Sequence, residues 1–209
     1  MAKESYHHGD LRRALLDAAA EAIAEDGPAA LSLRELARRA GVSHAAPTHH
    51  FGDKKGLLTA LATEGFDRLA AALRESRAAS ASFLELGVTY VRFATTHRAH
   101  FEVMWRPDLY HADDPALAAA RERSGNALYS GVAELPDGHG RGDVRGADAR
   151  EADVRAADVH GGDVREAGLA AWSLAHGFAT LWLSGALPDM PDLPDDAARA
   201  VLRHLTHGG

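Results

Sequence analysis

Apolar residues recur along nearly the whole chain at the spacing of an amphipathic helix. The two-residue alternation of a half-buried strand is almost absent. Near the N-terminus, for example, Leu11, Leu15, Ala22 and Ile23 fall on one helical face. Glycines and prolines interrupt the pattern where helices would end. The pattern therefore predicts an all-α fold for the 209 residues.

Periodicity and breakers together give the expected helix bounds. The predicted helices are 10–26, 33–40, 44–50, 54–76, 81–97, 99–105, 114–135, 166–187 and 195–207. Side chains that can cap a helix N-terminus stand at the start of the first four helices. These residues are Asp10, Ser32, Ser43 and Asp53. Ser32 is followed three residues later by Glu35, which is the spacing of a capping box.

Residues 142–166 do not follow the helical pattern. Asp recurs there every five residues, and Val and Arg usually follow it. Five residues turn a helix by about 500°, so the Val positions spiral around it and form no apolar stripe. We expect 137–165 to be a solvated, low-complexity insertion that folding does not require. A short repeat coil that contacts a partner is the alternative.

Composition narrows the class of protein. The chain has no Cys, which excludes disulfides and thiolate chemistry. No apolar run approaches the about 18 residues of a membrane span, and the N-terminus lacks the apolar core of a secretion signal. We therefore expect a cytoplasmic protein. The net charge is −7, but residues 1–55 carry eight Lys/Arg and eight Asp/Glu, so all of the excess lies after residue 55. The neutral segment 1–55, called the head below, can bind phosphates, while the acidic remainder of the chain keeps the protein in solution.

The stretch "GVSHAAPTHHFGDKKGLL", residues 41–58, concentrates the polar side chains of that head. With the helix before it, the stretch has the spacing of a helix-turn-helix, and Gly41 can adopt the positive φ of the turn. Small and polar residues on the second helix suit insertion into a major groove about 12 Å wide. Lys54 opens the next helix, and helix N-termini bind phosphate. The predicted DNA-binding residues are Ser32, Arg34, Ser43, His44, Ala45, Thr48, His49 and Lys54.

Other roles for these residues remain open. Arg34 and Arg38 share a helix face, from which they can contact a DNA backbone or pair with nearby acids such as Glu35. His50 can pack inside the domain instead of facing DNA.

Metal binding is the main alternative chemistry. The histidines at 44, 49 and 50, or those at 97 and 100, would be the ligands. Zn²⁺ needs about four converging ligands, and no carboxylate or Cys completes a set within the first group. An all-α, His-rich metal sensor or metal-dependent enzyme is therefore kept as the alternative function. We expect no metal, no cofactor and no catalytic residue, because "GDKKG" is not a P-loop and no nucleophile has a recognisable base and acid.

Aromatic residues make up 6% of the chain, and many fall in helices that would enclose the centre of the C-terminal part. An apolar pocket with one or two polar groups is the usual form of a small-molecule site. The predicted ligand-binding residues are Phe101, Trp105, Tyr129, Trp172 and His176. Trp172 and His176 lie four residues apart on an apolar helix, where they form either a pocket wall or a hydrogen-bonded core pair.

Two motifs resemble the tetracycline-repressor (TetR) family of bacterial transcription regulators. The run "LSLRELARRAGVS" followed by "HHFGDKKGLL" is similar to its DNA-binding signature. The run "WSLAHGFATLWLSG", residues 172–185, resembles the C-terminal part of one branch, which carries a Trp and a His-Gly pair on one helix. Thr48 departs from the family pattern, which usually has a Tyr at this position that would reach a phosphate.

The resemblance implies two domains. Residues 1–52 would form a three-helix DNA-binding domain, and residues 53–209 a larger helical domain for effector binding and dimerisation. Helices 166–187 and 195–207 would pair across a two-fold axis to make the homodimer. The implied function is transcription regulation, and we expect a repressor that binds double-stranded operator DNA. A small apolar or aromatic effector would release it by changing the separation of its two heads.

Overall fold

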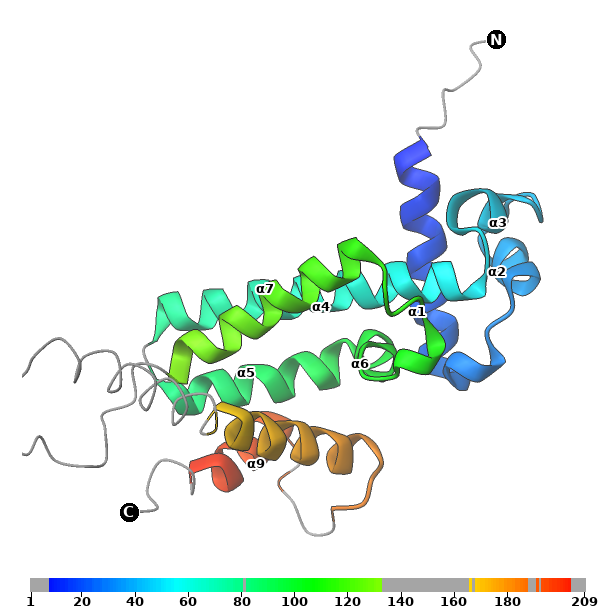
Figure 1. Cartoon of the computed structure of the whole chain (residues 1–209). Helices are drawn as coiled ribbons and strands as arrows, with labels where there is room; N and C mark the ends of the chain where they lie inside the picture. The colour runs from blue at the N-terminus through cyan, green and yellow to red at the C-terminus, as the bar shows by residue number, and fades with distance from the viewer. Residues whose placement is uncertain are drawn as a thin grey trace, which may run out of the picture. The chain divides into compact units, whose positions relative to one another are not determined.

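The structure is a computed structural model that describes residues 8–80, 82–132, 166, 168–187, 191 and 193–203 (Figure 1). All regular secondary structure in these ranges is helical, which confirms the all-α prediction. The helices are α1 (His8–Ala30), α2 (Leu33–Arg39), α3 (Ala46–Phe51), α4 (Lys54–Ala79), α5 (Phe83–Thr96), α6 (Arg98–Met104), the 3₁₀ helix η1 (Pro107–Leu109), α7 (Pro115–Val132), a helix over 168–183, and α9 (Pro194–Leu202).

The predicted start of the first helix was wrong, whereas its predicted end at residue 26 coincides with a break in the helical backbone at Gly27. Helix α1 begins at His8, so Asp10 lies inside the helix and not at its cap. At the other end, Gly27 adopts a φ of 77°, and the helix kinks and continues through Pro28 to Ala30. Proline fits the first turn of a helical segment, because no intrahelical bond is lost there.

Capping was predicted correctly for one helix and wrongly for another. Asp53 caps α4, since its Oδ1 accepts a hydrogen bond of 2.7 Å from the N–H of Gly56. This bond is the main reason that the pKa of Asp53 lies below its usual value. Ser32 stands at the N-cap of α2, but its side chain makes no capping bond. Glu35 does not complete the expected box and accepts instead from Arg38 Nε at 2.8 Å.

The chain divides into two compact units. The first contains residues 8–69 and 96–123 of the described chain, and the second contains residues 70–95 and those from 124 onward. Helices α4 and α7 contribute residues to both. The functional boundary predicted after residue 52 stays a prediction, because these units group residues by contact and not by role.

Helices α1, α4 and α6 build the core of the first unit. Leu15 of α1 and Leu57 and Leu61 of α4 are fully buried. Helix α6 packs against α1. Gly65 lets α6 approach α4 closely, because a Cβ at this position would stand 2.6 Å from the Sδ of Met104.

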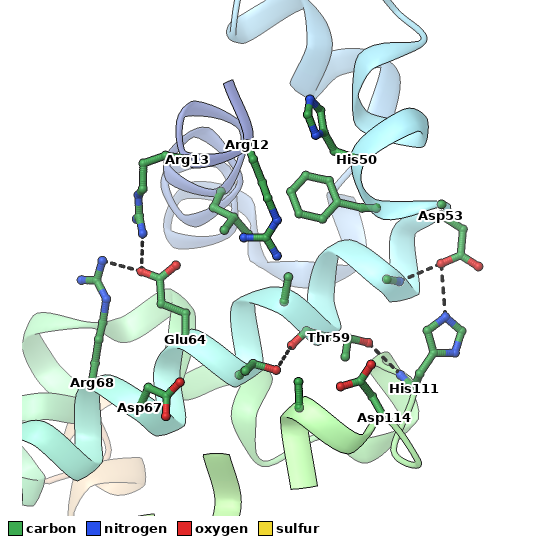
Figure 2. A pocket seen from close by; sticks show the side chains of 17 residues that line it. Arg12, Arg13, His50, Asp53, Thr59, Glu64, Asp67, Arg68, His111 and Asp114 are labelled. Carbon is green, nitrogen blue, oxygen red and sulfur yellow. Dashed lines mark hydrogen bonds and ion pairs between the residues drawn. The ribbon is translucent and has the colours of Figure 1, made fainter. Parts of the chain in front are cut away.

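A charged cluster centred on Glu64 joins these helices (Figure 2). Its carboxylate accepts a bond of 2.7 Å from Arg13 Nη1 of α1 and pairs with Arg68 one turn along α4. His100 Nε2 of α6 lies 3.6 Å from Glu64 Oε1, which is too long for a hydrogen bond. Burial opposes the ionisation of Glu64, but the contacts with His100, Arg13 and Arg68 outweigh it and lower its pKa to about 2. Glu64 therefore stays ionised.

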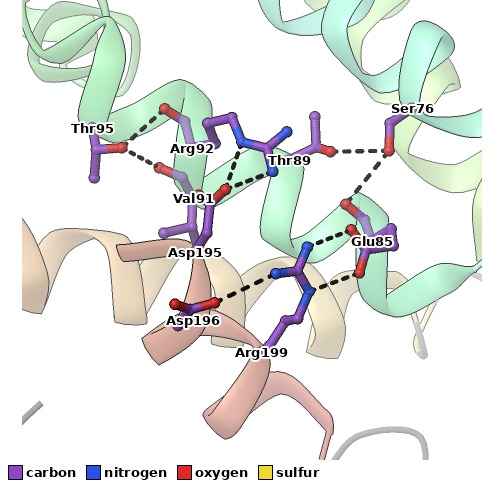
Figure 3. Close-up of polar contacts among 9 residues, drawn as sticks. All are labelled: Ser76, Glu85, Thr89, Val91, Arg92, Thr95, Asp195, Asp196 and Arg199. Atoms are coloured by element: carbon purple, nitrogen blue, oxygen red, sulfur yellow. Dashed lines mark hydrogen bonds and ion pairs between the residues drawn. The ribbon is translucent and has the colours of Figure 1, made fainter. Parts of the chain in front are cut away.

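Helix α5 contributes several buried residues to the second unit, and two ion pairs fix α9 against it (Figure 3). Arg92 donates to Asp195 at 2.6 and 2.8 Å, and Arg199 binds both oxygens of Glu85 at 2.9 and 3.0 Å. Gly87 gives room to Leu202 of α9, whose Cδ1 would lie 2.8 Å from a Cβ at that position. These contacts set the register of α9 on α5.

Replacing Glu64 by Gln tests the charged cluster. We expect the free energy of unfolding at pH 7 to fall by about 1–3 kcal/mol, because two arginines lose their acceptor charge. A carboxylate whose pKa is lowered by folding stabilises the protein above its unfolded pKa and loses that effect as the pH falls. The difference between the variant and the wild type should therefore shrink between pH 4.5 and about 2. Urea denaturation at several pH values measures it.

Asp67→Asn is the matched control. Asp67 lies on the same helix but its side chain is 45% exposed in its pair with Arg123. Its loss should cost less than about 1 kcal/mol. A Glu64→Gln effect that does not change with pH would contradict this account of the cluster.

Candidate functional site

The turn between α2 and α3 has the geometry of a helix-turn-helix. Gly41 has a φ of 66°, as predicted, and its N–H donates to the carbonyl of Arg38 at 3.2 Å. The N–H of Val42 donates to the carbonyl of Ala37 at 3.0 Å, which completes the end of α2. Helix α3 then begins at Ala46, with Ala45 at the N-cap, so the predicted cap at Ser43 was wrong.

Burial separates an inner face of this motif from an outer face. Leu36 and Ala37 of α2 and Pro47 of α3 are buried. Seven of the eight residues predicted to bind DNA are exposed: Ser32, Arg34, Ser43, His44, Ala45, Thr48 and His49. The short helices thus bury their apolar side chains and present small and polar ones to solvent. His50 is half-buried, and its ring packs near those of His49 and Phe51.

Charge on the outer face of α2 is divided between paired and unpaired arginines. Arg38 is held by Glu35, and Arg39 by Glu25 at 2.6 Å. Arg34 makes no ion pair with the side chains that the structure describes. The sequence left open whether Arg34 and Arg38 contact DNA or pair with acids. In the structure a neighbouring acid neutralises Arg38, whereas Arg34 remains available to an external anion.

Lys54, the eighth predicted DNA-binding residue, is half-buried at the start of α4. Its Nζ donates to the carbonyl of Ala29 at 2.9 Å, near the end of α1. An ammonium group has three donors, so two remain for a phosphate. The N–H of Gly56 is already bonded to Asp53 and is not available to a phosphate. Lys54 and the exposed Lys55 supply positive charge here.

In the second unit, Trp172 and His176 share one hydrogen-bonded network. The buried hydroxyl of Tyr90 accepts from Trp172 Nε1 at 3.2 Å and lies 2.9 Å from His176 Nδ1. Trp can only donate, so the Tyr90 oxygen accepts from it, and the Tyr90 O–H can donate to Nδ1 when the imidazole proton is on Nε2. Burial lowers the pKa of His176 and raises that of Tyr90, so both groups are neutral at pH 7.

A small apolar void adjoins this network. Its volume is about 20 Å³, and Leu86, Gly87, Leu128 and Trp172 are among its lining residues. It holds about one water molecule, so an effector would have to enlarge it.

The other predicted ligand-binding residues lie elsewhere. Tyr129 is half-buried on α7 in the same unit as Trp172. Phe101 and Trp105 belong to the first unit, where Trp105 packs edge-on against Phe66 with ring centres 5.2 Å apart. Within the second unit, the structure brings Trp172 and His176 of the predicted set together.

A larger cleft in the first unit was missed from the sequence (Figure 2). Its volume is about 810 Å³, and its lining comes from α1, from the end of α3 through α4, and from the segment at 111–116. No local motif marks it, because its walls come from three segments that lie far apart in the sequence.

Two further properties concern only the described residues. No three His, Asp or Glu side chains there form a group that could hold a metal ion. No helix in the described ranges is both long enough and apolar enough to cross a membrane.

Comparisons with known proteins agree with this geometry. Residues 15–61 match the family described as "Bacterial regulatory proteins, tetR family", and residues 83–205 match "Tetracyclin repressor-like, C-terminal domain". The HTH-type transcriptional regulator BetI of Cronobacter sakazakii is 30% identical over 189 residues, which cover 86% of this chain and 81% of that protein. For BetI of Rhizobium meliloti, the match is 49% over 49 residues, or 23% of this chain and 24% of the relative's length.

Solved structures share the fold over nearly the whole chain. A protein of unknown function from Rhodococcus sp. RHA1 is 34% identical with a TM-score of 0.73, covering 99% of this chain and 98% of that one. LfrR of Mycobacterium smegmatis, solved in complex with proflavine, is 20% identical with a TM-score of 0.59, covering 95% and 96%. The two family matches and the BetI relative show that this chain belongs to the TetR family of bacterial transcription regulators.

Proposed function

We propose that this protein is a repressor that binds operator DNA as a homodimer and is released by a small apolar or aromatic effector. The observation that carries the proposal is the outer face of the helix-turn-helix, where exposed small and polar side chains follow a positive-φ Gly41. A major groove about 12 Å wide accepts such a helix, and Ala45 allows close approach.

Base contacts and phosphate contacts fall to different residues. Thr48 and His49 lie on α3 and would meet base edges or the sugar-phosphate backbone in the groove. Arg34 has no acidic partner in the described part of the chain and would pair with a phosphate. Lys54 would contact a phosphate beside α3, using donors that Ala29 does not occupy. Its charge strengthens binding to any sequence.

Lys54→Gln tests the phosphate contact, since glutamine removes the charge and leaves a polar side chain at this position. On a DNA fragment that the wild type binds, we expect the log–log slope of affinity against salt to fall by about one unit. Thr48→Ala should weaken binding without that change in slope. Fluorescence anisotropy between low and high salt measures both variants.

Arg74→Gln is the control, because Arg74 is an exposed arginine outside the motif. It should leave affinity and slope unchanged. A wild-type slope in Lys54→Gln would remove Lys54 from the interface.

Exposed leucines support the homodimer. Among the described residues, the large hydrophobic side chains that remain exposed are Leu169, Leu174, Leu181 and Leu193. Leu174 and Leu181 lie seven residues apart on the helix over 168–183, so they share one face. Clustered exposed apolar residues mark interaction surfaces. A second copy of the chain would cover this face across a two-fold axis, as the family resemblance implies.

Leu181→Glu should therefore weaken the dimer. Two glutamates would be buried in each symmetric interface, and burying unpaired charge is costly. We expect sedimentation velocity at micromolar concentration to show a monomer. Ala118→Glu, at an exposed position of α7, is the control and should sediment as the wild type does. A dimeric Leu181→Glu variant would place the interface elsewhere.

The effector site is proposed beside the Tyr90 network. The void there is apolar, Tyr90 and Trp172 are among its lining residues, and His176 is hydrogen-bonded to the Tyr90 hydroxyl. This combination suits an apolar or aromatic ligand. The related fold of LfrR was solved with the aromatic compound proflavine. Because the void is only about 20 Å³, binding must move its walls, and that movement is the proposed signal.

A thermal-shift screen of apolar and aromatic compounds tests this placement. A ligand at 100 times its dissociation constant adds about 2.7 kcal/mol of stability. His176→Ala removes one hydrogen-bond partner of the buried Tyr90 hydroxyl, so we expect it to lower stability by about 1–3 kcal/mol and to abolish release from DNA by the hit compounds. Operator affinity without effector should persist. If compound shifts and release survive in His176→Ala, the histidine only supports packing.

A further inference from the structure

The cleft of the first unit has the size of a ligand site. Its volume of about 810 Å³ falls in the range of about 300–1,000 Å³ that small-molecule sites occupy. It lies wholly within the first unit, so it is separate from the void beside Tyr90. Figure 2 shows charged side chains around the cleft. The partners that these side chains already have determine which charge a ligand of the cleft should carry.

All four acidic side chains of the cleft are already hydrogen-bonded. The pairs are Glu64 with Arg13 and Arg68, Asp67 with Arg123, Asp53 with the N–H of Gly56, and Asp114 with the N–H of Leu117. The carboxylates are thus occupied in holding helices together or in capping them. A cationic ligand would have to displace one of these partners.

Arg12 differs from the other arginines of the cleft. Its guanidinium lies over the ring of Phe51, with Cζ 5.2 Å from the ring centre. It makes no ion pair with any side chain that the structure describes. Planar guanidinium groups bind carboxylates through two parallel hydrogen bonds. Stacking on Phe51 holds this cation in place beside the cavity, at the end of α3.

The walls around Arg12 are fixed in advance. Arg13 and Glu64 join α1 to α4 on one side. On the other side, the N–H of His111 donates to Thr59 Oγ1 at 3.0 Å, which holds the segment after η1 against α4. Leu16 and the Phe51 ring add apolar surface. A preformed cleft loses less entropy when it binds a ligand.

We propose that this cleft binds a small organic carboxylate, with the carboxylate on Arg12 and the apolar body against Phe51. The ligand would touch α1 and the last residue of α3, so the site belongs to the DNA-binding unit and is independent of the effector site proposed beside Tyr90.

Calorimetric titration of the full chain with 2-naphthoate tests the proposal. We expect saturable binding that weakens about tenfold or more in Arg12→Gln, since a charge-assisted bond is lost. Phe51→Leu, which removes the aromatic wall, should also weaken binding. Arg74→Gln, which changes an exposed arginine outside both sites, should bind as the wild type does. The uncharged 2-naphthamide should bind at least about tenfold more weakly than 2-naphthoate.

Three results would overturn the proposal. Equal naphthoate affinity in Arg12→Gln and the wild type would place the ligand elsewhere, and loss of binding in His176→Ala alone would place it beside Tyr90. The third concerns a phosphate of the DNA backbone, which has related chemistry. A fall in DNA affinity and salt slope in Arg12→Gln without any carboxylate present would assign Arg12 to the DNA.

Discussion

Two contacts between α1 and α4 hold the DNA-binding motif in shape. At the first turn of α4, Lys54 Nζ bonds the carbonyl of Ala29, and further along the helix Glu64 accepts from Arg13. Helices α2 and α3 have only seven and six residues, and such short helices are not stable alone in water. Helices α2 and α3 lie between α1 and α4 in the chain. The two contacts between α1 and α4 therefore hold both ends of the segment that contains α2 and α3.

In the second unit, a buried polar group is satisfied without any net charge. The Tyr90 hydroxyl accepts a hydrogen bond from Trp172 Nε1 and is hydrogen-bonded to His176 Nδ1, so three uncharged side chains are joined in one network. A ligand that enters the adjacent void must either leave these hydrogen bonds intact or replace some of them with its own. The network therefore offers a physical basis for coupling ligand entry to a change in helix packing.

The sequence predicted features whose physics is local. Gly41 was placed at positive φ and Asp53 at a helix cap because each depends on only a few neighbouring residues. Ser32 was wrongly predicted to form a capping box, because Glu35 found stronger partners in charged arginines. No sequence pattern predicted contacts between residues that lie far apart in the chain. The ion pair of Arg92 with Asp195, for example, joins residues 103 positions apart. The cleft beside Arg12 was missed for the same reason. The pentad insertion predicted at 137–165 lies outside the described residues.

Selection of bound fragments from a random pool of double-stranded DNA is the most direct test of the central claim that a symmetric pair of helix-turn-helix heads reads DNA. A dimer with a two-fold axis should enrich an inverted repeat, with half-site centres separated by about 10–10.5 base pairs or a multiple of that. The Leu181→Glu monomer should enrich at most a single half-site. No enrichment by the wild type, or a motif without inverted symmetry, would contradict the account.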